Sequence, residues 1–323
     1  MNPGSEADDP RPGLRRVPVG DRPNKVSSGD FAGPPPAAAG ASFAQFYDSL
    51  PHILAADSLH AVAHGVASAA RHDREIVWML GGHVVKTGLS VVLIDLMERG
   101  AVTHLAVNGA TVIHDYEACR WGGTSEDVEA GLSDGTFGMA LETGRDMNLA
   151  IRRGRDEKLG LGAALGADLE AREDNGHEEL SLLLACRRLG VPITVHVAIG
   201  ADIIHQHPEA DGAAIGETSY TDFLALVESL RGLDDGGVVV NVGSAVILPE
   251  VFLKALTICR NRDDGAPRGF VTADLDMIRQ YRPRVNVIER PTRTGGGKGY
   301  QITGHHEIMV PLLAWAIGEE LSR

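Results

Sequence analysis

Five short apolar runs in this sequence end abruptly in glycine, histidine, asparagine or acidic residues, which are residue types that bind anions or transfer protons. Buried parallel strands are short continuous apolar runs, and ligands of open parallel sheets bind just beyond the carboxyl ends of the strands. We therefore predict that the polar residues after these runs line one ligand-binding site. They are Gly81, Gly82 and His83; Asn108 and Gly109; Gly200 and Asp202; Gly243 and Ser244; and Thr272 and Asp274.

The Gly81-Gly82-His83 segment is followed by a predicted helix over residues 85–99. Glycines let a ligand approach the backbone, and the free N–H groups at a helix N-terminus attract anions, so a phosphate or pyrophosphate is the expected ligand. The segment is neither a Walker loop nor a GxGxxG fingerprint. The alternative is a tight turn that binds nothing.

The second segment is followed by His114, Asp115 and Glu117, a histidine and two acids within four residues at the opening of a predicted helix. A histidine beside carboxylates suits acid–base chemistry, so His114, Asp115 and His83 are the candidate bases. The alternative is an acidic helix N-terminus that Asp115 caps.

His205 and His207, with Asp202, form an HxH pattern that is typical of some metal sites. The two rings share a face only in an extended segment, and the spacing supplies no third ligand. Adjacent His305 and His306 point apart on a helix, so that pair is a poor metal site as well. We predict no metal and favour a ligand-binding or subunit-contact loop.

Lys298 lies in a glycine-rich segment over residues 295–299. Such a lysine is a candidate for an anion clamp or for covalent imine chemistry, which would require its pKa to be depressed. The alternative is a flexible hinge with a mobile surface lysine.

Elements of alternating type must position these residues. Strands separated by helices predict a parallel sheet, so the expected fold is Rossmann-like doubly wound α/β with helices on both faces. Residues 43–323 form the predicted single domain, with a helical excursion or mobile lid near 152–176. Residues 1–42 form a predicted proline-rich tail, either disordered or an arm that binds a neighbouring subunit. The predicted strands are 75–80, 102–107, 192–199, 237–242, 269–274 and 284–289.

The composition excludes several classes of protein. A net charge of −14 argues against nucleic acid or an anionic membrane surface as a partner. No apolar stretch reaches membrane-spanning length, and the N-terminus lacks the apolar core of a signal peptide. Cys119, Cys186 and Cys259 follow no disulfide or zinc pattern and indicate reduced thiols in the cytoplasm.

The order of segments resembles the deoxyhypusine synthase family over most of residues 43–320. The family's Pro-Val-x-x-Pro-Ala-x-x-Asp-Gly strand is similar to Pro192 to Asp202, and its Thr-Ala-Gly-Gly turn with acids behind it resembles Asn108 to Thr111 with Asp115. The closing Phe-Pro-Leu-Leu helix resembles Val310-Pro311-Leu312-Leu313. The resemblance implies an NAD pocket across the five segments, a homotetramer, and transfer of an aminobutyl group through a lysine imine.

The family's Trp-Gly-Lys motif, which carries the nucleophilic lysine, has no counterpart here, and Lys298 follows a different strand. We therefore predict a divergent NAD-binding enzyme that dehydrogenates or transfers a group on an amine or another small substrate. The alternatives are a non-catalytic nucleotide-binding protein, and a metal-dependent hydrolase or lyase that uses His205 and His207.

Overall fold

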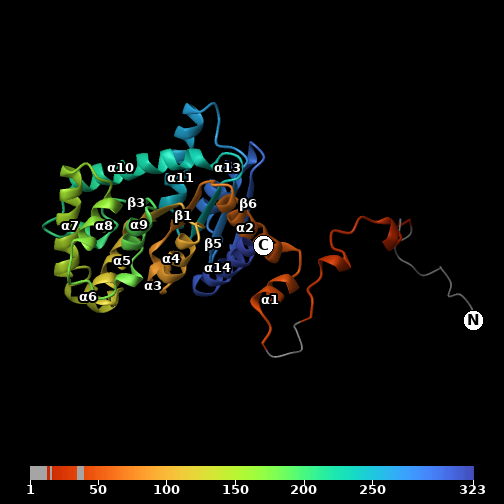
Figure 1. Ribbon diagram of the computed structural model, residues 1–323, viewed down its shortest axis with the longest axis horizontal. Coiled ribbons are helices and arrows are strands. Elements are labelled where there is room, and N and C mark those ends of the chain that lie inside the picture. Colours follow the sequence, from red (N-terminus) through yellow and green to blue (C-terminus); the bar gives the residue numbers. More distant parts are fainter. Residues whose placement is uncertain (1–12, 15–16, 35–39) are drawn as a thin grey trace, which may run out of the picture.

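The computed structural model of the protein describes residues 13–14, 17–34 and 40–323. Its centre is a six-stranded sheet in the order β3-β2-β1-β4-β5-β6, with every neighbouring pair parallel (Figure 1). The chain starts in the middle of the sheet, winds to one edge, and returns to wind to the other. The predicted α/β fold with a parallel sheet is confirmed. The strands are β1 (Ile76–Leu80), β2 (His104–Asn108), β3 (Ile193–His196), β4 (Val238–Val242), β5 (Val271–Asp276) and β6 (Lys298–Thr303).

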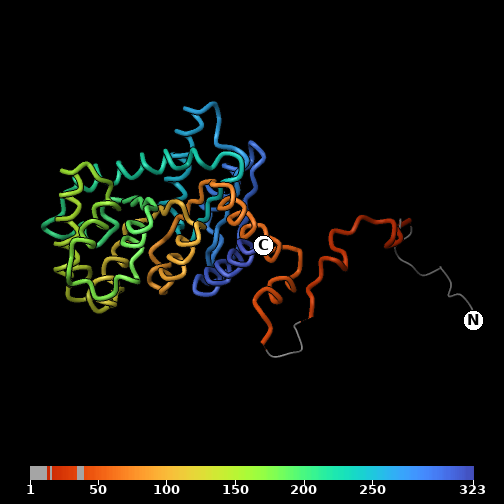
Figure 2. The backbone as a smooth tube through the Cα atoms, in the orientation of Figure 1, coloured from red at the N-terminus to blue at the C-terminus, as the bar shows by residue number. Residues whose placement is uncertain are grey.

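Helices cover both faces of the sheet, as the backbone trace in Figure 2 also shows. Successive side chains of a strand point to opposite faces, so Trp78 and Leu80 join one apolar core while Val77 and Met79 join the other. On the first face lie α2 (Leu54–Arg71), α4 (Ser90–Glu98), α5 (Gly109–Trp121), α9 (Leu182–Leu189) and α14 (His306–Ser322); on the second lie α10 (Gly212–Leu230) and α11 (Ile247–Arg262).

The predicted strand over residues 284–289 is wrong. The alternation of Val285 and Val287 favours a strand, yet these residues form a π-helical segment, η7 (Arg284–Glu289), between α12 (Tyr281–Pro283) and α13 (Arg290–Arg293). The sixth strand is β6, which arises from the glycine-rich segment. A Cβ on Gly299 would lie 2.5 Å from the carbonyl oxygen of Ile288, so a glycine is needed for η7 to pass over this strand.

The crossover from β2 to β3 holds a helical layer at one end of the sheet, and the predicted excursion lies within it (Figure 1). Arg120 on α5 donates to Asp146 and Asp174, at 2.6 Å in both cases. Asp168 accepts from Arg172 at 2.7 Å and from the Tyr116 hydroxyl at 2.7 Å. The buried Arg120–Asp146 ion pair and the Tyr116–Asp168 hydrogen bond thus join this layer to α5. Its helices are α6 (Val128–Asp134), α7 (Leu141–Asp156) and α8 (Leu161–Glu170).

Side chains of α10 cover the backbone of the edge strand β3. The carboxylate of Asp222 accepts from the N–H groups of Val195 and Gly162, at 2.8 and 3.0 Å. The Ser219 hydroxyl donates to the Val195 carbonyl at 2.8 Å and accepts from the Val197 N–H at 3.1 Å. The exposed edge of the sheet is therefore satisfied by a helix and not left free to pair with another chain.

The N-terminal segment over residues 17–34 extends away from the α/β body, and Val17, Val19 and Phe31 are exposed on it (Figure 1). It meets the rest of the chain where the His52 N–H donates to the Asp30 carbonyl at 3.1 Å. Residues 1–12, 15–16 and 35–39 of the predicted tail lie outside the described residues. The remaining short elements are α1 (Phe43–Ser49), α3 (Gly82–Lys86), η2 (Val19–Asp21), η3 (Ser28–Asp30), η4 (Glu178–Leu180), η5 (Ile203–Gln206) and η6 (Arg231–Leu233).

Across the described part of the chain, each helix is too short or too polar to span a membrane.

Candidate functional site

The direction of winding reverses between β1 and β4, and the loops that follow these two strands touch. A Cβ on Gly81 would lie 2.2 Å from the Gly243 carbonyl oxygen, and one on Gly243, whose φ is +66°, would lie 2.8 Å from Cε1 of His306. Only glycines permit this approach, so the two loops pack backbone against backbone at the point where the winding reverses. Ligands of open parallel sheets bind in the crevice at such a point of reversal.

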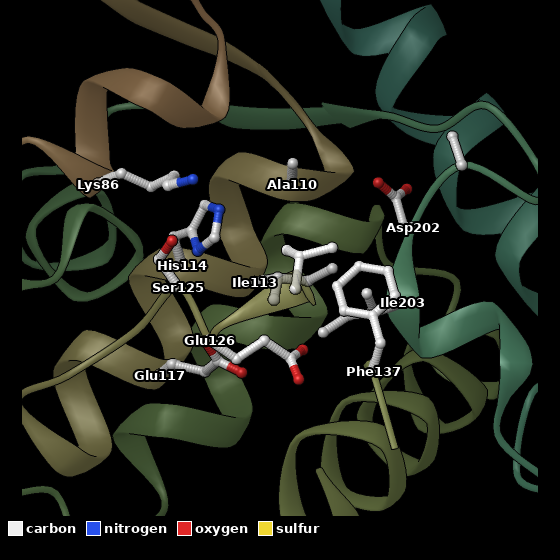
Figure 3. Close-up of a pocket in the computed structure, with 12 residues that line it drawn as sticks. Lys86, Ala110, Ile113, His114, Glu117, Ser125, Glu126, Phe137, Asp202 and Ile203 are labelled. Carbon is white, nitrogen blue, oxygen red and sulfur yellow. The ribbon is translucent and has the colours of Figure 1, made fainter. Parts of the chain in front are cut away.

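A cavity of about 180 Å³ lies beside this crevice, at the carboxyl ends of β1, β2 and β3 (Figure 3). We call it the α5 cavity because four of its lining residues come from α5. Its walls are Lys86, Ala110, Ile113, His114, Glu117, Ser125, Glu126, Val128, Phe137, Ala201, Asp202 and Ile203.

The imidazole of His114 is held in one orientation within the cavity. Its Nδ1 lies 2.7 Å from the Thr124 hydroxyl oxygen, and this hydroxyl donates to the carboxylate of Glu117. Because the single hydroxyl proton goes to Glu117, Thr124 accepts from His114, so Nδ1 carries the proton and Nε2 has a free lone pair. Burial, and then the charge of Lys86, lower the pKa of His114 to about 4. His114 is therefore a neutral, oriented base.

The opposite wall is the carboxylate of Asp202 (Figure 3). This side chain is 8% exposed and lies directly over Gly109, where a Cβ would come within 1.9 Å of Oδ2. Burial raises the pKa of Asp202 to about 6. The residue type at Gly109 is thus explained by the space that the carboxylate occupies.

His205 lies behind Asp202 and has an unused hydrogen-bond donor. Its Nδ1 accepts from the backbone N–H groups of Gly200 and Asp202, at 3.1 and 3.3 Å, so Nε2 carries the proton. Nε2 is buried, lies 3.9 Å from Oδ2 of Asp202, and has no hydrogen-bond partner among the described residues. One acceptor and one donor therefore stand together at this end of the cavity.

Asp115 does not reach the cavity. Its carboxylate accepts from the Leu182 N–H at 2.7 Å, the Leu183 N–H at 3.1 Å and the Ser181 hydroxyl at 2.9 Å. These are the first groups of α9, and burial raises the pKa of the carboxyl to about 6. Asp115 joins α5 to the N-terminus of α9, so the catalytic role predicted for it gives way to a structural one.

Lys298 lies far along the sheet from the other predicted residues. It is exposed at the first position of β6, paired in register with Val271 at the start of β5. All strands are parallel, so this is the amino edge of the sheet, opposite the edge that carries the cavity. The prediction that Lys298 forms an imine at the site is not supported by its position.

His83 remains close to the site, while Thr272 and Asp274 lie below its surface. The ring of His83 is exposed and lies 5.5 Å from the ring of His306. Thr272 and Asp274 are inside β5, which continues to Asp276, so both are fully buried. The carboxylate of Asp274 accepts from Asn241 at 2.8 Å and from Gln301 at 3.2 Å, and burial raises its pKa to about 6.

The histidine pattern after β3 does not assemble a metal site. Nε2 of His207 donates to the Gly138 carbonyl at 2.8 Å, whereas His205 faces Asp202. No group of three or more histidine, cysteine or acidic side chains with metal-binding geometry occurs in the residues that the structure describes.

Four residues of the site were not predicted from the sequence. Three of them line the cavity, Lys86, Glu126 and Phe137, and the fourth, Thr124, orients the imidazole of His114. Lys86 is four residues after Gly82, so its place near a strand exit was a usable signal. Thr124 meets His114 only because the chain turns back after Trp121, and no local pattern indicates that contact.

No protein-family model and no curated protein matches this sequence. Solved structures do match it. Apo ArgZ, an arginine dihydrolase from the ornithine–ammonia cycle in cyanobacteria, has a TM-score of 0.51 at 16% identity, over 83% of this chain and 33% of that chain. The ternary complex of AgrE with ornithine and NAD+ has a TM-score of 0.52 at 16% identity, over 82% of this chain and 34% of that chain.

The likeness is one of fold. This chain spans about a third of the length of the ArgZ and AgrE chains. A putative deoxyhypusine synthase from Entamoeba histolytica is also similar, with a TM-score of 0.49 at 10% identity over 86% of this chain and 93% of that chain.

Proposed function

We propose that the chain is an NAD-binding enzyme that removes hydride and a proton from an amine or another small polar substrate. The observation that carries this proposal is the α5 cavity with its neutral, oriented His114, at the carboxyl ends of the strands and near the loops where the winding reverses. The AgrE complex with NAD+ and ornithine, which shares the fold, supports a dinucleotide and an amine as the ligands.

The pyrophosphate is proposed to lie along the loops at Gly81, Gly82, Gly243 and Ser244, because ligands of open parallel sheets bind where the winding reverses. NAD+ held there would supply a hydride acceptor for a carbon that bears an amine or a hydroxyl group. Nε2 of His114 takes the proton from the substrate nitrogen or oxygen, which leaves an imine or a carbonyl. Glu117 acts through Thr124 to hold the imidazole in the tautomer that can accept this proton.

Charged groups at the two ends of the cavity would orient the substrate. Lys86 stands beside His114 at one end, and the carboxylate of Asp202 stands at the other (Figure 3). Ile113 and Phe137 lie between them and would contact an aliphatic stem. A cationic or hydroxyl group of the substrate is therefore expected at Asp202, and an anionic group at Lys86.

NAD+ titration of the full chain tests this proposal. NAD+ is expected to raise the thermal midpoint, because a ligand selective for the folded state stabilises it by mass action. Lys86→Glu should reduce the shift, whereas Lys158→Glu, an exposed lysine between α7 and α8, makes the same charge change away from the site and should not. Absence of a shift with NAD+, NADH or NADP+ would exclude the proposed cofactor.

Gly82→Leu is a poor probe of this site. A Cβ on Gly82 would already lie 3.1 Å from Cβ of Ala110 and 3.3 Å from Cδ2 of His114. A larger side chain there would displace α5 itself, so a lost NAD+ shift would not report on the ligand alone.

A further inference from the structure

A second cavity, of about 260 Å³, lies at the carboxyl end of β3 on the opposite face of the sheet, between α10 and α11. We call it the β3 cavity. The loop that follows β3 separates the two cavities, since Val197 and Ile199 line the β3 cavity while Ala201 and Asp202 line the α5 cavity. The β3 cavity is lined by His196, Val197, Ile199, Ile215, Gly216, Ser219, Tyr220, Phe223 and Val251.

The walls of this cavity carry no formal charge and include two aromatic rings. Tyr220 and Phe223, one turn apart on α10, stack with ring centroids 6.1 Å apart and planes inclined by 28°. At the rim, Tyr220 is 61% exposed and Ile199 is 65% exposed, although the exposure of their apolar side-chain surface to water is unfavourable. Exposed aromatic surface beside a hollow marks a binding site more often than an isolated exposed residue does.

The floor is His196, which is 3% exposed and half-satisfied. Its Nε2 lies 3.0 Å from the Thr194 hydroxyl. Its Nδ1 makes no hydrogen bond to a described residue, although the ring lines the cavity. Nδ1 is therefore available to a ligand in the cavity, which could donate a hydrogen bond to it or accept one from it.

His196 belongs to a chain of hydrogen bonds that crosses from β3 to β2 and α10. The Thr194 hydroxyl is also 2.9 Å from Nε2 of His104, and Nδ1 of His104 is 2.7 Å from the Ser229 hydroxyl. Burial lowers the pKa of both histidines to about 3, so both rings are neutral near pH 7.

The tautomers of the two rings are coupled because Thr194 has one hydroxyl proton. If Thr194 donates to His196, His104 donates to Thr194, and Nδ1 of His196 presents an N–H to the cavity. If Thr194 donates to His104 instead, His196 donates to Thr194, and Nδ1 presents a lone pair. Nδ1 of His196 can therefore form a hydrogen bond with either an acceptor or a donor on the ligand, and the imidazole stays neutral in both cases.

We propose that the β3 cavity binds an uncharged nitrogen heteroaromatic ring, which stacks on Tyr220 and Phe223 and hydrogen bonds to Nδ1 of His196. An aromatic wall favours a flat ring, the absence of charged walls favours an uncharged one, and the adaptable imidazole suits a ring nitrogen or an exocyclic amine.

Titration of the full chain with free adenine tests this proposal, with ¹⁵N-labelled histidine side chains as the reporter. We expect saturable binding with a Kd of about 1 mM or tighter. The imidazole signals of His196 should shift, and so should those of His104, which lies outside the cavity but shares Thr194. Adenine that binds without moving the His104 signals would contradict the coupled relay.

Gly216 provides a matched pair of variants. It lines the cavity on α10, and a Cβ there would meet no atom within 4 Å. Gly216→Phe should fill the cavity and weaken adenine binding at least tenfold, whereas Gly216→Ala should keep it. Alanine and phenylalanine both have a higher helix propensity than glycine, so neither variant is expected to lose binding through unfolding. Equal binding by the two variants, or none by the native chain, would overturn the proposal. Adenine is also part of NAD+, but only binding in the β3 cavity responds to Gly216→Phe and shifts the His196 signals, so the two proposals can fail separately.

Discussion

The hydroxyl of Thr124 lies 2.7 Å from Nδ1 of His114, and this contact determines which ring nitrogen is free to act as a base. The arrangement places Glu117 behind Thr124 and leaves Nε2 as the acceptor. A carboxylate that orients a histidine directly or through one intermediate group is a recurring way to prepare a general base.

The pKa of His114 is expected to be near 4 and to depend on Lys86. Lys86→Met removes the positive charge that opposes protonation, so the pKa of His114 should rise toward its ordinary value near 6.5. Imidazole NMR titration measures this without knowledge of the substrate. Lys158→Met should leave the titration unchanged, and an unaltered His114 titration in Lys86→Met would show that Lys86 does not act on this ring.

Thr124→Val should lower kcat with an oxidisable substrate by about tenfold or more, because the imidazole then loses its fixed tautomer. NAD+ binding should be unchanged, since Thr124 does not line the cavity. Thr124→Ser keeps the hydroxyl and should retain most activity. If Thr124→Val and Thr124→Ser have equal kcat values, Thr124 does not position the base.

Gly109→Ala should destabilise the fold by about 1–3 kcal/mol, because the new methyl group overlaps the carboxylate of Asp202. In the Asp202→Ala background the same substitution should cost much less, since the overlapping oxygen is gone. Chemical denaturation of the four proteins of this cycle measures the coupling. Additive costs would show that Asp202 does not pack on Gly109.

Asp222 should make the protein less stable as the pH rises. Its pKa is raised to about 7 by burial, against 3.8 for the ordinary group, so the folded state holds a proton that the unfolded state releases. The contribution is complete below about pH 4 and is lost as the pH rises toward 7. In Asp222→Asn, which can still accept from Val195 and Gly162 through one oxygen, the free energy of unfolding should vary less with pH over this range. An unchanged slope would point to other buried acids.

Arg120→Met should destabilise the protein by about 1–3 kcal/mol, because it removes the buried ion-pair partner of Asp146, which keeps only the less buried Arg145 and Arg172. Hydrogen exchange should accelerate in α7 and α8 more than in β4 and β5, since Arg120 joins the helical layer to α5. Exchange that accelerates equally everywhere would mean that the layer and the sheet unfold together.

Local sequence patterns were sufficient for much of the fold. The apolar runs that became β1, β2 and β4 were placed within two residues, because a buried strand depends on a short continuous apolar stretch. Residues 284–289 were predicted as a strand because their alternating apolar residues fit a strand as well as a helix. The strand β6 was missed because it contains Gly299, which the close approach of η7 requires and which is not typical of a strand.

Chain order and local composition are enough to predict that glycines and polar residues follow the strands of a parallel sheet. Which of these residues meet depends on how the strands and helices pack. Strand order and direction place Lys298 at the amino edge of the sheet, far from His114, although both stand in polar, glycine-containing segments. Asp115 and Asp202 both follow strands, yet α9 closes over Asp115 while Asp202 still lines a cavity. The chemistry of an acid or a histidine depends on what packs against it, and that is set by contacts between segments distant in the chain.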